Sequence, residues 1–570
     1  MEEQLNLFLK SLIPESIDFS VEPSARPDFG HYATNVAMKL ASVRGEAPLT
    51  IAEQIAKDAR EKGMHLLSRV EVARPGFINF WLSDSALEEG MKGVLSAGKK
   101  WGRPASRAGS GKPTKNEKKT IVIDYSHPNI AKPMSVAHLR STIIGAALYN
   151  VFAFSGWKTV GDNHLGDWGK QFGVLIAAYK EISNLKNKKS NIKIEDLLVL
   201  YVDYTARMKE NPELEESARR ETKKLQEGDR ENTAIWKLFY KISLAEFKKA
   251  YSLLGVSFDY YLGESFYKSM LPEIVQEALY RGIAERSEGA VIIPHEGIPS
   301  FVIQKSDEAF LYSTTDLAAI KYRREKFKAD TVLYVVDNGQ SLHFEQLFRS
   351  AEKLGFVGSM QLMHVKFGLV LAEDMKKLST RAGRHVALLE VIHEAVDRAQ
   401  KIVDEKRADI TKRKREKIAK AVGIAALKYN DLSQNRQSDI TFRWDAMLSF
   451  EGNSAPYLLY SYARIKSILR KAGRFSRGKV VFTNDAERNL AIMVMRFPGV
   501  LDKVRETFFP HYLAEYLYEL AKTVNSFYEN IPVLKAEKEM RRSRISLVAS
   551  AAETLNTGLT LLGIQTVETM

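Results

Sequence analysis

A stretch near residue 130 has the residue types and the spacing that a nucleotide-binding site requires. The run TIVIDY at residues 120–125 is almost continuously apolar, which is typical of a buried parallel strand. A loop follows, and from Leu139 to Val151 apolar residues recur at the spacing of a helix. Strand, loop and helix form the first half of a βαβ unit. The N-terminus of such a helix presents unpaired N–H groups and a partial positive charge to a phosphate.

Three polar side chains lie where this loop meets the helix. Ser135 is predicted to cap the helix, Lys132 stands just before it, and His138 falls in the first turn, near any bound triphosphate. Taken singly, each is more simply a capping or surface residue. Their conjunction behind a buried strand favours a nucleotide site.

Two other segments have only the spacing of a phosphate loop. Residues 93–100 and 473–480 both show glycine, four residues, glycine and lysine, but neither continues with Ser or Thr. No strand precedes residue 93, and Gly98 is more simply the end of a helix. We therefore assign no phosphate loop to either segment.

Two further groups of residues contain charged side chains that suit substrate binding or catalysis. Tyr312 and Asp316 lie four apart, one helical turn, so they are expected to share a face. The alternative for Asp316 is that it caps the helix that follows. Residues 377–381, KLSTR, place two cations around a hydroxyl, although such a segment alone is more often a solvated loop. Cations are needed wherever negative charge grows on a reacting phosphate.

The stretch from Ile123 to Gly145, IDYSHPNIAKPMSVAHLRSTIIG, resembles the HIGH-containing signature of the arginyl-tRNA synthetases, a class I family. His138 matches the second histidine of HIGH, while Ser135 and Ala137 replace its first His and its Gly. The segment KLSTR resembles the second class I signature, KMSKS, with Thr380 in place of the second Lys. The resemblance runs from about residue 20 to residue 570 and is weakest in about 180–235.

The resemblance implies roles for individual residues. It implies that the cations and the histidine of the two signatures assist catalysis, namely Lys132, His138, Lys377 and Arg381. It implies ATP contacts from Pro128, Ser135, Val136, Ala137, His138, Lys377, Leu378 and Ser379. It implies an arginine pocket of Asp124, Asn129, His164, Tyr312, Asp316 and Gln340. Carboxylates suit that pocket because a guanidinium presents five donors in a planar fork.

The two ends of the chain also resemble the family. Residues 431–436 (DLSQNR), 452–457 (GNSAPY) and 525–530 (NSFYEN) resemble its DALR-type anticodon-binding region. The resemblance implies tRNA contacts from Phe29 near the N-terminus and from a helical stripe of Tyr457, Tyr460 and Arg464. From its residues alone, that stripe is more often core packing than a platform on which bases stack.

The order of helical and strand patterns along the chain predicts the fold that positions these residues. We expect an α/β Rossmann-like catalytic core with insertions, a small N-terminal α+β domain and a C-terminal all-α helical bundle. Helical and strand spacings alternate before about residue 395, and helices dominate after it. The predicted ranges are 1–102 for the N-terminal domain, 103–119 for a linker, 120–395 for the core with a helical insert at about 180–250, and 396–570 for the anticodon-binding domain.

Composition is consistent with a nucleic-acid partner. The 570 residues carry 84 Lys and Arg against 70 Asp and Glu, a net charge of +14, which favours a polyanion, although a basic protein without such a partner is the alternative. There is no cysteine, which excludes disulfides, thiolate nucleophiles and thiolate zinc sites. No apolar run reaches the ~18 residues of a membrane span, and the N-terminus begins MEEQ without a secretory signal.

The resemblance implies an arginine–tRNA ligase. Such an enzyme uses ATP with Mg²⁺ to convert L-arginine to arginyl-adenylate, releasing pyrophosphate, and transfers arginine to the 3'-terminal ribose of tRNA(Arg). We expect no metal site, no zinc and no membrane partner, and we expect a cytoplasmic monomer. Two alternatives stay open. One is a class I synthetase for another amino acid, and the other is a non-catalytic tRNA-binding paralogue, which Ser135, Ala137 and Thr380 make conceivable.

Overall fold

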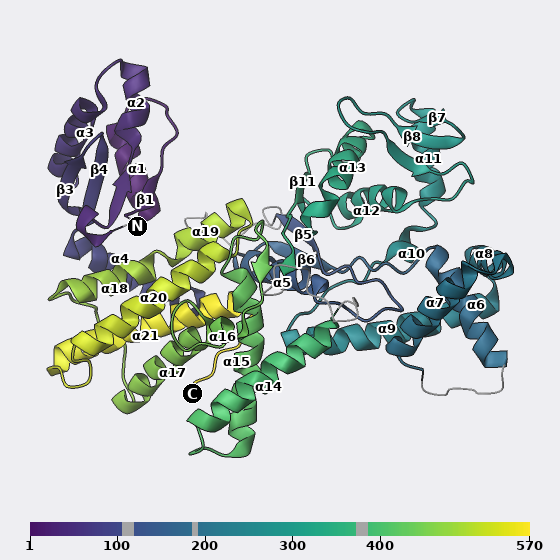
Figure 1. Cartoon of the computed structure of the whole chain (residues 1–570). Coiled ribbons are helices and arrows are strands. Elements are labelled where there is room, and N and C mark those ends of the chain that lie inside the picture. Colours follow the sequence, from purple (N-terminus) through teal and green to yellow (C-terminus); the bar gives the residue numbers. More distant parts are fainter. Residues whose placement is uncertain (25, 105–118, 185–191, 372–385) are drawn as a thin grey trace.

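The computed structural model describes residues 1–24, 26–104, 119–184, 192–371 and 386–570 (Figure 1). It contains an N-terminal α+β unit, a central α/β core and a large C-terminal group of helices (Figure 1). The predicted fold class is confirmed. No helix among the described residues is long and apolar enough to cross a membrane.

The N-terminal unit is a four-stranded antiparallel sheet in the order β1-β2-β4-β3, covered by helices. Its helix α4 lies outside this sheet and packs on α18 of the C-terminal helices. The unit comprises α1 (Glu2–Leu12), β1 (Val21–Pro23), η1 (Pro27–Phe29), β2 (Tyr32–Thr34), α2 (Val36–Arg44), α3 (Pro48–Lys62), β3 (Leu67–Ala73), β4 (Phe77–Leu82), α4 (Asp84–Ala97) and η2 (Gly98–Lys100).

The core is built on a parallel sheet in the order β11-β10-β5-β6. These strands are β5 (Thr120–Asp124), β6 (Lys158–Asp162), β10 (Thr331–Tyr334) and β11 (Gln361–His364). The register places Asp124 between Asp162 and Tyr334 at the carboxyl ends of the strands. That edge is where ligands bind in open α/β sheets.

Helix α5 (Ala137–Phe154) connects β5 to β6, and most of its residues are buried. The remaining elements before residue 371 form the insert and the covering layers. They are α6 (Lys170–Asn184), α7 (Ile194–Met208), α8 (Pro212–Glu227), α9 (Arg230–Leu254), α10 (Glu264–Tyr267), α11 (Leu271–Tyr280), β7 (Glu285–Ser287), β8 (Ala290–Ile293), β9 (Phe301–Gln304), α12 (Tyr312–Lys326), η3 (Asn338–Gln340), α13 (Ser341–Lys353) and β12 (Val370–Leu371).

The C-terminal part is helical apart from β13, which pairs with β12. Its elements are α14 (Leu388–Lys406), α15 (Lys412–Leu432), β13 (Ile440–Thr441), α16 (Trp444–Met447), α17 (Ala455–Ala472), α18 (Asp485–Met495), α19 (Phe497–Thr507), α20 (His511–Asn530) and α21 (Lys538–Leu561). The predicted boundary at residue 395 needs correction, because it falls inside α14, which is continuous from Leu388.

Both segments with phosphate-loop spacing mark the ends of helices. Gly98 follows the last residue of α4 with a φ of +51°, and Gly473 follows α17 with a φ of +73°. The positive φ explains why glycine stands at these positions.

A buried ion pair joins α5 to the C-terminal helices. The Arg140 side chain on α5 is fully buried, and its Nη2 lies 3.0 Å from the Asp431 Oδ1 on α15. The same guanidinium donates to the Ser438 carbonyl oxygen at 2.9 Å. Since the signature helix and α15 share this contact, the predicted catalytic and anticodon-binding parts are mechanically connected.

Replacing Asp431 by Ala should strongly destabilise the protein. The change leaves the Arg140 charge buried without its partner, which typically costs about 3–5 kcal/mol. Thermal unfolding should therefore show a clearly lower midpoint. The control Asp409→Ala removes an exposed ion pair with Arg407 and should leave the midpoint unchanged. Equal midpoints for Asp431→Ala and wild type would contradict a structural role for the pair.

Candidate functional site

The loop after β5 has a strained backbone that several hydrogen bonds hold in place. Ser126, His127 and Ala131 have positive φ values of 84°, 52° and 63°, which are unfavourable for residues with a Cβ. The Ser126 N–H donates to the Ser141 Oγ at 2.8 Å, and the Ala131 N–H donates to the Ser243 Oγ at 2.7 Å. Backbone strain of this kind concentrates at binding sites, which agrees with a ligand-binding role for the loop.

Ser135 does not cap α5. The helix begins at Ala137, and Val136 occupies the capping position without a side-chain hydrogen bond. The Ser135 Oγ instead lies 3.1 Å from the His138 Nδ1. Because the helix begins one residue later than a Ser135 cap requires, this prediction was wrong, although Ser135 and His138 do lie together at the start of α5.

The start of α5 is tied to the chain that follows residues 372–385. The Val136 N–H donates to the Val386 carbonyl oxygen at 3.0 Å, and Ser135 pairs with Ala387 in an isolated bridge. The KMSKS-like residues lie outside the described residues: Lys377, Leu378, Ser379, Thr380 and Arg381. The residues after them nevertheless begin beside the amino end of α5.

The other residues predicted around ATP have distinct environments. Lys132 is exposed, with its Nζ 5.2 Å from the centroid of the Tyr201 ring on α7. Pro128 is buried, and its carbonyl oxygen accepts from the Gly166 N–H at 3.2 Å. Ala137 is exposed at the first position of α5. The loops after β5 and β6 therefore pack together.

Asn129 and His164 lie in these two loops, which meet where Asn129 pairs with Gly166. An added Cβ at Gly166 would lie only 1.8 Å from the Asn129 Oδ1, so a larger residue would displace the Asn129 side chain. The His164 ring lies 5.7 Å from the Tyr267 ring, and its buried Nδ1 has no hydrogen-bond partner among the described residues. Both side chains border the carboxyl edge of the sheet.

Helix α12 presents Tyr312 and Asp316 at its start. The helix begins at Tyr312, so Asp316 lies in the second turn, and the alternative that it caps the helix is excluded. The Asp316 Oδ2 lies 2.7 Å from the Nε2 of His343, a residue on α13 that the sequence analysis missed. The Tyr312 ring also lies 4.9 Å from the His343 ring. Gln340 is exposed in the short helix just before α13.

The carboxylate of Asp124 already has two partners inside the protein. Its Oδ2 lies 2.7 Å from the Arg323 Nη2, and its Oδ1 lies 2.7 Å from the His127 Nε2. Burial raises the pKa of Asp124, but the neighbouring charges of Arg323 and His127 outweigh burial and hold this pKa well below its usual range. This geometry argues against the prediction that Asp124 binds the guanidinium of a ligand, because both of its carboxylate oxygens already have partners inside the protein.

A second carboxylate in the same region has no cationic partner among the described residues. Glu264 begins α10, and its Oε2 accepts from the Trp168 N–H at 3.2 Å. Burial, helped by the charges of Asp167 and Asp316, raises the pKa of Glu264 to about 8. Neither Glu264 nor Asp316 has a lysine or arginine partner within the described part of the chain. Sequence reasoning missed Glu264 because an acid at the start of a short helix usually serves the helix dipole.

The residues predicted to contact tRNA differ in exposure. The Tyr460 side chain on α17 is 47% exposed, whereas the Tyr457 hydroxyl accepts from the Asn525 Nδ2 at 3.1 Å. Arg464 pairs with Glu529 at 3.1 Å. Phe29 is 46% exposed in the N-terminal unit. Of the α17 stripe, Tyr460 is thus the residue with a free surface, and its neighbours are partly engaged in packing.

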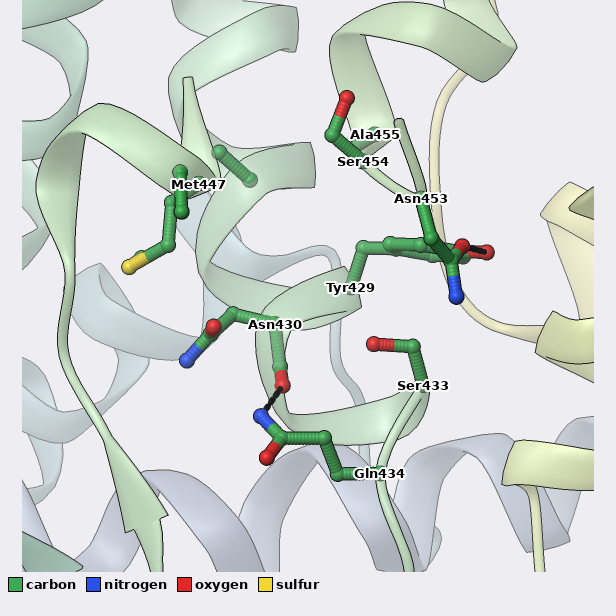
Figure 2. Close-up of a pocket in the computed structure, with 10 residues that line it drawn as sticks. Tyr429, Asn430, Ser433, Gln434, Met447, Asn453, Ser454 and Ala455 are labelled. Carbon is green, nitrogen blue, oxygen red and sulfur yellow. Dashed lines mark hydrogen bonds between the residues drawn. The ribbon is translucent and has the colours of Figure 1, made fainter. Parts of the chain in front are cut away.

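Two of the C-terminal motifs meet at a pocket of about 240 Å³ (Figure 2). Ser433 and Gln434 come from the end of α15, and Asn453 and Ser454 come from the loop that precedes α17 (Figure 2). The Asn430 Nδ2 beside them is buried without a hydrogen-bond partner among the described residues. The fold therefore brings together segments that are about twenty residues apart in the sequence.

Comparison with known proteins identifies the class of this arrangement. Residues 106–444 match the family model for tRNA synthetases class I (R), catalytic domain, and residues 458–570 match the DALR anticodon binding domain. Residues 1–82 match the arginyl tRNA synthetase N terminal domain. The catalytic core is that of a class I aminoacyl-tRNA synthetase.

Similar proteins narrow the class to one family. The chain is 41% identical over 545 residues to an arginine–tRNA ligase of Fusobacterium nucleatum, covering 94% of this chain and 93% of that protein. It is 40% identical to one from Laribacter hongkongensis, covering 96% of each. The crystal structure of arginyl-tRNA synthetase from Plasmodium falciparum matches with a TM-score of 0.85 and 29% identity, covering 100% of this chain and 99% of that one. The chain belongs to the arginyl-tRNA synthetase family, as its sequence motifs predicted.

The raised pKa of Glu264 should make its contribution to stability depend on pH. The unfolded chain loses this proton near its ordinary pKa of about 4.3, and the folded protein holds it until about pH 8, so stability falls as pH rises between these values. Glu264→Gln cannot ionise and should raise the thermal midpoint at pH 8 far more than at pH 5. Glu405→Gln, at an exposed position on α14, is the control and should show no such difference. An equal gain at both pH values would contradict the burial effect.

Proposed function

We propose that this protein activates L-arginine with ATP and transfers the arginyl group to the 3'-terminal ribose of tRNA(Arg). The observation that carries this proposal is a pair of carboxylates near the carboxyl edge of the parallel sheet, Glu264 and Asp316, that lack a lysine or arginine partner among the described residues. A buried carboxylate without a cation is costly unless a ligand supplies one. The names and the 40–41% identities of the relatives support arginine as that ligand.

The guanidinium of arginine would bind to Glu264 and Asp316, with Tyr312 beside them. Glu264 replaces Asp124 in this role, because Arg323 already pairs with Asp124. A planar guanidinium can donate to two carboxylates at once, whereas the ammonium of lysine cannot bridge them in the same way. Asn129, His164 and Gln340 would then hold the α-amino and carboxylate end, as the family resemblance implies.

ATP would bind at the start of α5, where Ser135 and His138 meet the helix N-terminus. The amino-acid carboxylate attacks the α-phosphate, and negative charge grows there and on the leaving pyrophosphate. Lys132 would supply part of the required positive charge, with Lys377 and Arg381 as further contributors. The protein provides positioning and charge rather than a nucleophile. We expect Mg²⁺ to enter with ATP.

The C-terminal helices and the N-terminal unit would bind tRNA through Tyr457, Tyr460, Arg464 and Phe29. The net charge of +14 supports a polyanionic partner. We further propose that the protein acts as a monomer in the cytoplasm and needs no zinc.

Asp316→Ala should raise the arginine KM far more than the ATP KM. Losing a hydrogen bond to a charged group costs roughly 1.5–3 kcal/mol, or about 10–150-fold in KM. Steady-state aminoacylation measures both constants. The control Asp307→Ala changes an exposed acid and should alter neither. A selective loss of ATP binding would contradict the assigned role of Asp316.

The same assays separate the two alternatives. ATP–pyrophosphate exchange across the amino acids, with tRNA present, should be fastest with arginine, and another preference would support a class I synthetase of different specificity. Wild type and His138→Ala are then compared in aminoacylation. If both are inactive while tRNA still binds, the non-catalytic paralogue is correct.

Tyr460→Ala should weaken tRNA binding at constant salt. Stacking on an exposed aromatic ring is worth roughly 1–3 kcal/mol per base. A nitrocellulose-filter or anisotropy titration should show the weaker affinity, with the steep salt dependence of wild type unchanged because no charge is lost. Tyr280→Ala, at an almost fully exposed tyrosine that ends α11, should bind like wild type. Identical behaviour of the two variants would remove Tyr460 from the interface.

A further inference from the structure

A group of polar atoms without hydrogen-bond partners lies under the carboxyl edge of the sheet. Arg323 Nε and Nη1, the hydroxyls of Tyr267 and Tyr334, Asn163 Oδ1 and His164 Nδ1 are all buried and have no hydrogen-bond partner among the described residues. The Arg323 guanidinium lies 5.3 Å from the centroid of the Tyr334 ring. Orphaned buried groups are rare in folded proteins and need a specific explanation.

Arg323 uses one nitrogen to hold two carboxylates. Its Nη2 lies 2.7 Å from the Asp124 Oδ2 and 2.8 Å from the Asp162 Oδ2, and its side chain is only 1% exposed. Asp124 and Asp162 are paired in register on β5 and β6, so their side chains leave the same face of the sheet. Two acids and one fixed cation give this group a net charge of −1.

The helix that carries Arg323 also carries the proposed substrate ligands. Tyr312, Asp316 and Arg323 lie on α12, four and seven residues apart, which places them along one face of the helix. One helix therefore fixes the positions of both Arg323 and Asp316, and Asp316 has no lysine or arginine partner in the part of the chain that the structure describes. At the strand ends a buried arginine neutralises one of two acids, whereas among the described residues Glu264 has no cationic partner and Asp316 has only His343.

Arginine has two cationic groups, the guanidinium and the α-ammonium, so the pocket must determine which of the two groups binds at which acids. We propose that Arg323 is a positioning residue that determines this orientation: by neutralising one of the two acids at the strand ends, it makes them a weaker site for the substrate guanidinium than Glu264 and Asp316. The inference rests on the proposed function, because it concerns the same pocket.

Arg323→Met and Arg323→Lys test the proposal in the full-length protein. An ammonium placed at the Nη2 position can still bridge both acids, so Arg323→Lys should keep the arginine KM within about threefold of wild type. Arg323→Met leaves two unpaired acids that compete for the substrate cation, and the arginine KM should rise at least about tenfold while the ATP KM stays within about twofold. Arg140→Met is the matched control, because it also removes a buried arginine from an aspartate, and it should lower the thermal midpoint without raising the arginine KM.

The pH dependence adds a measurement that a purely structural role would not change. In wild type the arginine KM should fall from pH 6 to pH 8 as Glu264 ionises. In Arg323→Met the acids Asp124 and Asp162 titrate in the same range without their cation, beside His127, His164, Tyr267 and Tyr334. Because their anions bind the guanidinium in competition with Glu264, this fall should shrink or reverse. A wild-type profile in Arg323→Met would overturn the proposal.

The other outcomes are equally decisive. Any of three results would overturn the proposal. They are a wild-type arginine KM in Arg323→Met, a raised arginine KM in a well-folded Arg323→Lys, and a parallel rise of the arginine and ATP KM values caused by a general loss of stability. If Arg323→Met does not fold, Asp124→Asn decides: its arginine KM should rise much less than that of Asp316→Ala, and an equal rise would show that Asp124 binds the substrate directly. A wild-type enzyme that does not use arginine would instead overturn the proposed function.

Discussion

The buried contact of Arg323 with Asp124 and Asp162 determines what the rest of the site can do. The parallel register of β5 and β6 forces two carboxylates side by side at the carboxyl edge of the sheet. Two unpaired buried acids would be strongly destabilising, and pairing with a cation compensates much of that cost. Since the cation comes from α12, the position of that helix is coupled to the sheet, and with it the positions of Tyr312 and Asp316.

A second buried ion pair extends this coupling from the core to α15, one of the C-terminal helices. Arg140 lies on α5, a few residues beyond His138, and contacts Asp431 on α15. Helix α15 also lines the pocket in which the two C-terminal motifs meet (Figure 2). A displacement of α15 would therefore act on α5, whose first turn borders the proposed ATP site. The ion pair connects the core to the C-terminal helices, because α5 carries the arginine and α15 carries the aspartate.

Local sequence patterns predicted the parts of the fold that depend on local physics. The apolar run at residues 120–125 and the periodic residues after Leu139 became β5 and α5, because burial on all sides selects such residues. The role of Asp124 could not be anticipated, since its partner Arg323 is 199 residues away and no local pattern connects them. Ser135 failed as a cap for a related reason: the start of α5 is fixed by the distant Val386 backbone.

Asp124 and Glu264 illustrate how one pocket gives two acids opposite properties. Both are largely removed from water, yet the pKa of Asp124 is held low by neighbouring cations, whereas burial and neighbouring acids raise the pKa of Glu264. An acid that already has a partner contributes to the structure and offers little to a ligand. An acid without one destabilises the empty protein, and a bound cation reverses that cost. Glu264 thus lowers the stability of the empty protein while it favours the binding of a cation. Because such a residue is costly in a core, we expect to find it at a binding site.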